Sequence, residues 1–184
     1  MGTDKAFLRL GNVTLLEHAI ATAKEVCATI ALVGDQERLA SFGSVVEDRF
    51  AGQGPLAGIH AALNSEFSSE LNLVVAVDTP ALSAELLQYL VTSAQASSAT
   101  VTAIRANTHV QPLCAVYGRE FGATAEKALL AGRNKIEPLF SDVPVHIIEE
   151  YELKAVGFAP DIFDNVNTPE DWERIQRRLG VINR

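Results

Sequence analysis

One carboxylate follows directly on the most apolar run of the sequence. Residues 71–77 read "LNLVVAV" and are followed by Asp78, Thr79 and Pro80. A carboxylate at the end of a buried strand is costly unless it meets a cation, a hydrogen-bond donor or water. Asp78 is therefore a candidate ligand for Mg²⁺. The other interpretation, that Asp78 caps the following helix, fits this segment equally well.

Two further segments have residue types suited to phosphate binding. Asp48 follows a short apolar strand, and the loop "GQGPLAGI" of residues 52–59 places glycines around Pro55. Glycines let the backbone approach a charged ligand closely, although this loop has neither the Walker sequence nor the spacing of a dinucleotide fingerprint. Lys5 adds a point charge. Taken singly, a solvated Asp48, a tight turn and a solvated Lys5 are the simpler interpretations.

The segments that carry these residues alternate between apolar strands and amphipathic helices. We expect strands at residues 28–34, 44–48, 71–77, 99–105, 111–118 and 144–150. We expect helices at residues 14–27, 55–67, 83–95, 119–132 and 168–180, the first capped by Thr14 and the last by Thr168. This alternation predicts an α/β fold with a doubly wound, mostly parallel sheet and helices on both faces. Ligands bind beyond the carboxyl ends of such strands, so Asp48, the glycine loop and Asp78 should converge on one rim.

Composition limits the classes of protein to which the chain can belong. A length of 184 residues, 48% of them hydrophobic, suits one domain spanning residues 1–184. A formal charge of −8 argues against a nucleic-acid partner, because that affinity comes largely from Lys and Arg. Cys27 and Cys114 lie among apolar residues and are expected in the core. The sequence has no run of about 18 apolar residues, so we expect a soluble cytoplasmic protein without a membrane partner.

Five segments in order give the sequence a family resemblance. "MGTDKAFL", "GPLAGI", "VVAVDTP", "QPLCAVY" and "NVNTPEDW" together resemble the molybdenum cofactor guanylyltransferase family of small nucleotidyltransferases, over almost the whole chain. The resemblance implies a nucleotide-diphospho-sugar transferase-like, Rossmann-like fold. It also implies Mg²⁺-dependent transfer of GMP from GTP to molybdopterin carrying molybdenum, with release of pyrophosphate. Other molybdenum cofactor proteins and recipient molybdoenzymes would be further partners.

The same resemblance assigns roles to individual residues. Lys5 matches a phosphate-contacting lysine, and Asp78 matches a metal-binding aspartate that also contacts the nucleotide. Asn165 and Asn167 match paired asparagines near the reacting groups and the pterin. The resemblance thus implies a catalytic set of Lys5, Asp78, Asn165 and Asn167.

Other positions are matched to ligand binding only. Asp48 matches an aspartate of the GTP site, and the resemblance extends nucleotide contacts to Gly54, Pro55 and Leu56. Arg133 and Lys135, in "AGRNKIEPLF", lie where contacts to the pterin phosphate are expected. The family's asparagine after its second strand is not matched, because Gly34 and Asp35 stand there instead.

The sequence starts inside a family motif. Members of the family begin with a strand and a glycine-rich loop, "LAGGxSxRMGxDK", and this sequence starts at the methionine of that motif. The first strand of a doubly wound sheet is normally central, so we expect two strands with unpaired backbone groups. The favoured interpretation is a longer cellular protein. The alternatives are a sheet that closes by pairing the neighbouring strands, and a relative that binds without catalysing.

Other functions are also compatible with these motifs. Among enzymes, the second hypothesis after a guanylyltransferase is a cytidylyltransferase acting on the same pterin, or another sugar-phosphate nucleotidyltransferase. Base choice depends on hydrogen bonds to the base edge, and much of the loop that would make them is not in this sequence. Outside enzymes, the alternative is a non-catalytic binding protein of the molybdenum cofactor pathway.

Overall fold

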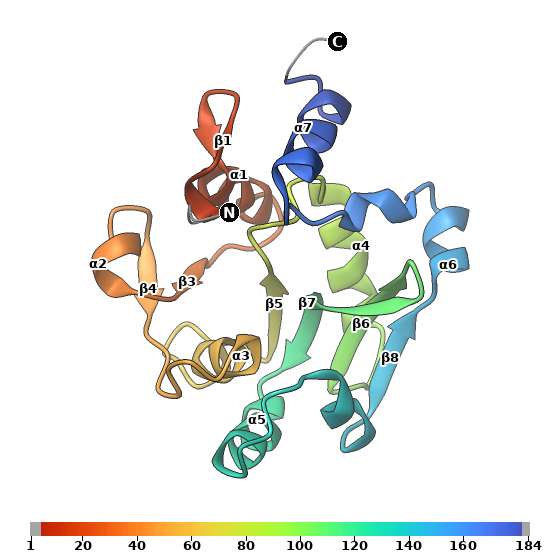
Figure 1. The fold of residues 1–184 in the computed structure, drawn as a ribbon. Coiled ribbons are helices and arrows are strands. Elements are labelled where there is room, and N and C mark those ends of the chain that lie inside the picture. The colour runs from red at the N-terminus through yellow and green to blue at the C-terminus, as the bar shows by residue number, and fades with distance from the viewer. Residues whose placement is uncertain (1–4, 182–184) are drawn as a thin grey trace.

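The computed structural model describes residues 5–181, and the helices and strands alternate along them (Figure 1). The α-helices are α1 (Leu15–Lys24), α2 (Gln36–Leu39), α3 (Pro55–Leu63), α4 (Ala84–Gln95), α5 (Phe121–Leu130), α6 (Glu150–Ala155) and α7 (Pro169–Arg178). The strands are β1 (Arg9–Leu10), β2 (Val13–Thr14), β3 (Ala31–Val33), β4 (Ser44–Val46), β5 (Leu71–Val75), β6 (Val101–Ala106), β7 (His109–Gly118) and β8 (Val145–Ile148). Three short 3₁₀ helices are η1 (Lys5–Phe7), η2 (Glu137–Ser141) and η3 (Pro160–Phe163).

The α/β class and the mostly parallel sheet are confirmed, with one reversed strand. In the sheet ordered β5-β7-β6-β8, the strands β5, β6 and β8 run in the same direction, and β7 runs antiparallel to its two neighbours. The cause is the two-residue turn of Asn107 and Thr108, whose φ angles are 49° and 67°. Such a turn forms a hairpin, and a hairpin joins only antiparallel strands.

Helices cover both faces of the four-stranded sheet, as predicted. On one face α3 and α5 pack together against β6 and β7, in a core that includes Leu56, Tyr117 and Phe121. On the other face α4 packs against the same two strands through Leu86 and Leu90. The sheet therefore holds α3, and the loop that precedes it, in a fixed place.

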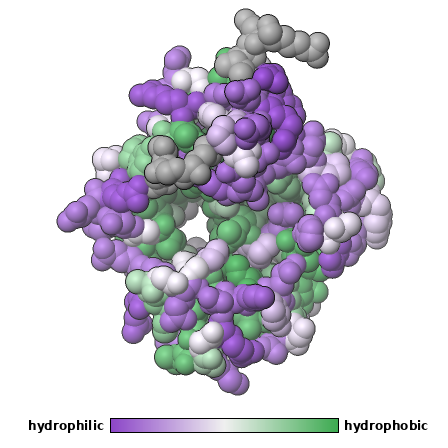
Figure 2. Space-filling model, viewed as in Figure 1, coloured by the Kyte–Doolittle hydropathy of each residue, from purple (hydrophilic) through white to green (hydrophobic). Residues whose placement is uncertain are grey.

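The strands β3 and β4 form a separate parallel pair that is not joined to the larger sheet. Strand β3 pairs with β4 through Ala31, Leu32 and Val33, and β5 pairs with β7, but β3 and β5 do not pair with each other. The alternative in which these neighbouring strands close the sheet is therefore not adopted. Figure 2 shows an opening through the molecule that is bordered in part by hydrophobic residues.

Local sequence signals explain most helix ends. Thr14 caps α1 by accepting a hydrogen bond from the N–H of Glu17, and Thr168 caps α7 by accepting one from Asp171, so both predicted caps are confirmed. Helix α6 begins at Glu150, where a strand was expected, because Glu149 and Glu152 form a capping box.

The structure also contains elements that the sequence did not predict, and it separates the two cysteines. The turn α2 and the hairpin β1-β2 were not predicted. Cys114 is buried, as expected, whereas Cys27 is only half-buried. Within residues 5–181, no helix combines the length and the apolar character needed to cross a membrane.

Candidate functional site

The carbonyl of Asp78 anchors the loop that leads into α7. This carbonyl oxygen accepts a hydrogen bond from the N–H of Val166 at 2.9 Å, which brings residues 165–167 to the end of β5. Asp78 is not the cap of the next helix, because Ser83 accepts the capping hydrogen bond from the N–H of Leu86. The carboxylate of Asp78 is therefore free of that structural role.

A lysine from the start of the chain lies against this carboxylate. The ammonium Nζ of Lys5 is 3.4 Å from Oδ2 of Asp78 and donates a hydrogen bond to Oδ1 of Asn167 at 2.7 Å. The side chains of Lys5 and Asp78 are about one-third exposed, at 34% and 29%. Three of the four predicted catalytic side chains thus meet at a site that solvent reaches.

The asparagine pair is oriented by the buried residue between its members. Val166 is fully buried and packs in a small core with Leu10, Leu15 and Ile175, whereas Asn165 and Asn167 are exposed. Among the contacts of residues 5–181, none joins Asn165 to Lys5 or Asp78. The structure therefore brings Asn167 to the centre and leaves Asn165 beside it on the surface.

The glycine loop ends at the N-terminus of α3, where a ligand could approach the backbone closely. Gly54 is the N-cap of α3 with φ 75°, a left-handed conformation that favours glycine, and Pro55 takes the first helical position. Leu56 is fully buried, and its side chain packs in the core below the loop. Asp48 accepts a hydrogen bond from the N–H of Phe50 at 2.7 Å, which fixes the start of the loop.

A cavity borders the glycine loop at Pro55 and Gly58, but Lys5, Asp78 and Asn167 are not among the residues that line it. Its volume is about 460 Å³, and its lining includes Pro55 together with Ala6 and Val77, the chain neighbours of Lys5 and Asp78. The convergence of Asp78 and the glycine loop on one rim stays a prediction. Asp48 is not among the residues that line the cavity.

Two lining residues were not predicted as site residues. Asp35 caps α2 by accepting a hydrogen bond from the N–H of Arg38, and both residues line the cavity. The guanidinium carbon of Arg38 lies 5.6 Å from the centre of the Phe7 ring, so this cation reaches towards η1. The signal for Asp35 was its position directly before a helical turn, which is typical of an N-cap.

The predicted pterin contacts lie apart from this centre. Arg133 and Lys135 are exposed in the segment between α5 and η2, which occupies the lower part of Figure 1, whereas α7 occupies the upper part. No contact described for residues 5–181 joins either cation to Lys5, Asp78 or Asn167. Their role stays a prediction.

The buried imidazole of His60 packs against Phe50, just before the glycine loop. His60 of α3 is almost fully buried, and its ring meets the Phe50 ring edge-on with centroids 5.0 Å apart. Burial lowers the pKa of His60 below its ordinary value, against the opposing effect of the Glu126 carboxylate. The neutral ring therefore acts as packing under the loop.

Asp78 is the carboxylate that this site offers to a metal ion. Within the described part of the chain, no group of three or more His, Cys, Asp or Glu side chains is arranged to hold a metal. Mg²⁺ is commonly bound through one or two carboxylates together with substrate phosphates. Asp78, with the amide oxygen of Asn167 nearby, fits an ion of that kind only.

The α/β fold, with a lysine, an aspartate and an asparagine beyond the carboxyl end of β5, is typical of the nucleotidyltransferase class. A family model described as the MobA-like NTP transferase domain matches residues 1–146. The chain belongs to this family.

Individual relatives and structures agree with the family. The chain is 33% identical over 182 residues to a "Probable molybdenum cofactor guanylyltransferase" of Carboxydothermus hydrogenoformans, covering 98% of this chain and 91% of that protein. The fold is similar to that of molybdopterin-guanine dinucleotide biosynthesis protein A from Archaeoglobus fulgidus, with a TM-score of 0.85, 24% identity and coverage of 98% and 93% of the two chains.

A cytidylyltransferase has the same fold. The 2-C-methyl-D-erythritol 4-phosphate cytidylyltransferase from Thermus thermophilus gives a TM-score of 0.70 at 21% identity, covering 97% of this chain and 94% of that one. The fold alone therefore does not select the base of the nucleotide.

Proposed function

We propose that this chain transfers GMP from GTP to molybdopterin carrying molybdenum, forming molybdopterin guanine dinucleotide and releasing pyrophosphate. The observation that carries the proposal is the meeting of Lys5 with Asp78 and Asn167 beside a cavity bordered by the glycine loop. The identity of the substrates is supported by the relative named as a probable molybdenum cofactor guanylyltransferase at 33% identity.

The reaction needs charge neutralisation more than a protein nucleophile. An oxygen of the terminal phosphate of the pterin attacks the α-phosphorus of GTP, and the bond to the bridging oxygen breaks so that pyrophosphate leaves. Both reactants are anions, so a fixed cation and in-line positioning lower the barrier. A lysine ammonium has three donors, and Lys5 directs two of them at Asp78 and Asn167. Among the described residues no acceptor is given for the third, and it is proposed to bind a phosphate oxygen.

Asp78 is proposed to hold Mg²⁺ together with phosphate oxygens of GTP. When bound, this ion would neutralise part of the negative charge that develops on the transferred phosphate. Asn167 orients Lys5 through the 2.7 Å hydrogen bond, so the lysine keeps its place when the carboxylate turns to a ligand. In this proposal Asn167 orients the lysine and Asp78 binds the metal ion.

The remaining predicted residues are proposed to bind substrates. The backbone of Gly54, Pro55 and Leu56 lies at the N-terminus of α3, where the helix dipole favours a phosphate. Asp48 keeps this loop in place. The asparagine Asn165 and the exposed cations Arg133 and Lys135 are proposed to contact the pterin, within a single nucleotidyltransferase domain of residues 1–184. The cytoplasmic location stays a prediction.

A second candidate function is cytidylyl transfer to the same pterin. It is favoured by the shared fold of the Thermus thermophilus cytidylyltransferase. Calorimetric titration with GTP and with CTP, each with and without Mg²⁺, separates the two candidates, because a site that hydrogen-bonds one base rejects the other strongly. We expect Mg²⁺-dependent binding of GTP and at least about tenfold weaker binding of CTP. Preference for CTP would replace the guanylyl assignment.

The lysine is expected to contribute one charge-assisted contact. Changing Lys5 to Met should slow transfer about 10- to 150-fold, which corresponds to about 1.5–3 kcal/mol for a hydrogen bond to a charged group. Stability should change by less than about 1 kcal/mol, since the ion pair with Asp78 is exposed to solvent. Steady-state rates measure the first effect and urea unfolding the second. Lys24→Met, at the exposed end of α1, is the matched control. Equal transfer rates for the Lys5→Met and Lys24→Met variants would show that Lys5 is an ordinary surface lysine.

A further inference from the structure

The turn of residues 78–80, which carries the proposed metal ligand, is held by two other segments of the chain. The carbonyl oxygen of Asp78 accepts a hydrogen bond from the N–H of Val166 at 2.9 Å. The second anchor is a side chain of α1, because Nε2 of His18 lies 3.0 Å from the carbonyl oxygen of Pro80. His18 and Pro80 are 62 positions apart in the sequence, so this contact ties α1 to the turn that follows β5.

The chemistry of this contact determines what the imidazole does. A carbonyl oxygen only accepts hydrogen bonds, so Nε2 of His18 carries the hydrogen and donates it to Pro80. The side chain of His18 is half-buried, and a hydrogen bond that water replaces poorly is costly to lose there. His18 is therefore a hydrogen-bond donor to the turn.

The turn fits closely against α1 at this contact. A cavity of about 10 Å³, no larger than one water molecule needs, lies between them, and its lining includes His18, Thr22, Thr79 and Pro80. Thr79 is buried, and its hydroxyl donates a hydrogen bond to the carbonyl oxygen of Ala76 at 3.0 Å. The turn thus has little room to shift while the bond from His18 is in place.

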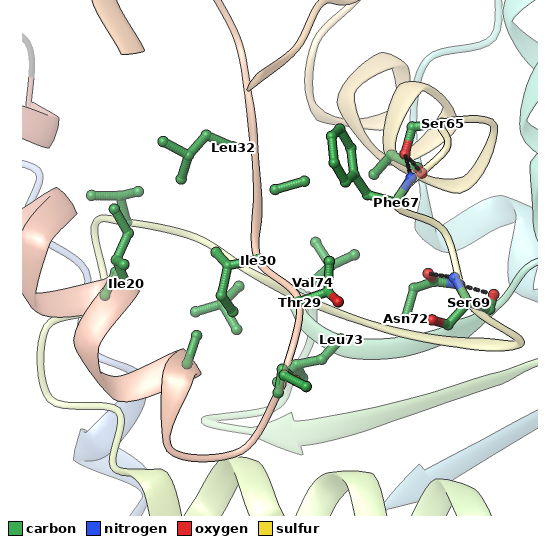
Figure 3. Close-up of a pocket in the computed structure, with 18 of the residues that line it drawn as sticks. Ile20, Thr29, Ile30, Leu32, Ser65, Phe67, Ser69, Asn72, Leu73 and Val74 are labelled. Atoms are coloured by element: carbon green, nitrogen blue, oxygen red, sulfur yellow. Dashed lines mark hydrogen bonds between the residues drawn. The ribbon is translucent and has the colours of Figure 1, made fainter. Parts of the chain in front are cut away.

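The next residues of α1 have a more open environment. Ile20 borders a cavity of about 360 Å³ that is also lined by Leu32 of β3 and Leu73 of β5 (Figure 3). Apolar side chains on either side of a cavity lack the close contacts that hold packed elements together. The polar contact of His18 therefore matters for the place of α1 against the turn.

The same part of α1 also supports the segment that carries the lysine. The N–H of Leu15 donates to the carbonyl oxygen of Leu8 at 2.9 Å, and the N–H of Leu8 donates to that of Lys5 at 3.0 Å. Leu15 and His18 are three positions apart, so they are neighbours on the helix surface. One turn of α1 thus contacts both the segment of Lys5 and the turn of Asp78, whose charged groups are 3.4 Å apart.

We propose that His18 is a positioning residue, which sets the place of the Asp78 carboxylate relative to the Lys5 ammonium through its bond to Pro80. Its effect on the reaction is indirect, because it contacts a backbone carbonyl and not the carboxylate. Without this donor, the turn keeps its anchor at Val166 but loses its link to α1. The catalytic consequence rests on the proposed transfer of GMP, whereas the anchoring of the turn does not.

The first test uses the unchanged chain, so it does not depend on the folding of a variant. A ring N–H gives a direct proton NMR signal when a hydrogen bond protects it from exchange with water. We expect such a signal from Nε2–H of His18 in the ¹⁵N-labelled chain, and none from the exposed His109. A His18 ring that carries its hydrogen on Nδ1, or has no protected N–H, would overturn the proposal.

A pair of variants tests the anchoring by hydrogen exchange without nucleotide. His18→Leu removes the donor at similar volume, and His18→Gln restores a side-chain N–H donor. The Val166 amide reports on the turn, because it donates to Asp78 and exchanges when this contact opens. We expect exchange at Val166 to be about five- to tenfold faster in His18→Leu and within about twofold of the original in His18→Gln. The Gly118 amide, bonded to the Thr100 carbonyl at 2.7 Å, should exchange at the same rate in all chains.

Two results of this experiment would contradict the anchoring role. Unchanged exchange at Val166 in His18→Leu would show that the turn does not depend on the bond. Equal acceleration at Val166 and Gly118 would show a general loss of stability instead. His109→Leu, at an exposed histidine of β7, is the matched control and should leave both amides unchanged.

The link to catalysis has a separate readout. His18→Leu should lower kcat about tenfold and raise the Mg²⁺ concentration that gives half the maximal rate, while the KM for GTP changes less than about twofold. His18→Gln should recover most of the rate. An unchanged kcat in an active His18→Leu chain would overturn this link. An unchanged chain that transfers no GMP, with the expected exchange at Val166, would contradict the proposed function and support the anchoring role.

Discussion

Replacing Asp78 by Asn is expected to reduce GMP transfer by more than about 100-fold, since loss of an ion that neutralises the reacting phosphates removes several kcal/mol of stabilisation. The carboxylate is partly exposed, and its only described side-chain contact is with Lys5. The free energy of unfolding should therefore change by less than about 1 kcal/mol. The rate of pyrophosphate release over a range of Mg²⁺ concentrations measures the effect on transfer.

The control for this variant is a carboxylate that lies elsewhere. Asp142 is exposed at the end of η2, and Asp142→Asn should transfer GMP at the original rate. The Mg²⁺ dependence separates the assigned role from a general loss of charge, because Asp78→Asn should also require more Mg²⁺ to reach its residual rate. A folded Asp78→Asn protein that transfers GMP at close to the original rate would remove Asp78 from the centre.

Truncating Phe121 should have the largest effect on stability. Its ring is fully buried and lies 5.0 Å from the ring of Tyr117, in the core that joins α3 and α5 to the sheet. Phe121→Ala should lower the free energy of unfolding by about 3–5 kcal/mol, through lost apolar burial and the cavity that remains. Urea unfolding followed by far-UV circular dichroism measures this loss.

A conservative variant separates packing from other causes. Phe121→Leu keeps most of the apolar volume, so it should lose clearly less stability than Phe121→Ala. Helix α5 packs on α3, which follows the glycine loop, so GTP binding should weaken in the alanine variant as well. A loss below about 1 kcal/mol in Phe121→Ala would show that this core does not hold α3 in place.

Much of the fold was predictable because its signals are local. Thr14 and Thr168 stand directly before the helices that the sequence predicts, and in the structure each forms a capping box with the acidic residue three positions later. The direction of β7 was not predictable from apolar periodicity, which is the same for parallel and antiparallel strands. The Asn107–Thr108 turn determines it, and neither residue is glycine, the usual signal for such a turn.

The centre itself was predictable only through the family resemblance. Lys5 and Asn167 are 162 positions apart, and no periodicity relates residues at that separation. Asp78 was accessible to physical reasoning, because it ends an apolar strand. The structure adds that the capping interpretation fails, since Ser83 takes that role. Arg38 was overlooked because its place on the cavity depends on the short turn α2.

Analysis of the product is the most direct test of the proposed transfer. The chain is incubated with molybdopterin carrying molybdenum, Mg²⁺ and an equal mixture of GTP and CTP, and the pterin product is measured by mass spectrometry alongside pyrophosphate. We predict a GMP adduct formed in equal amount to pyrophosphate, with little CMP adduct. A CMP adduct as the main product, or the return of unmodified pterin from a folded protein that binds GTP, would contradict the guanylyltransferase assignment.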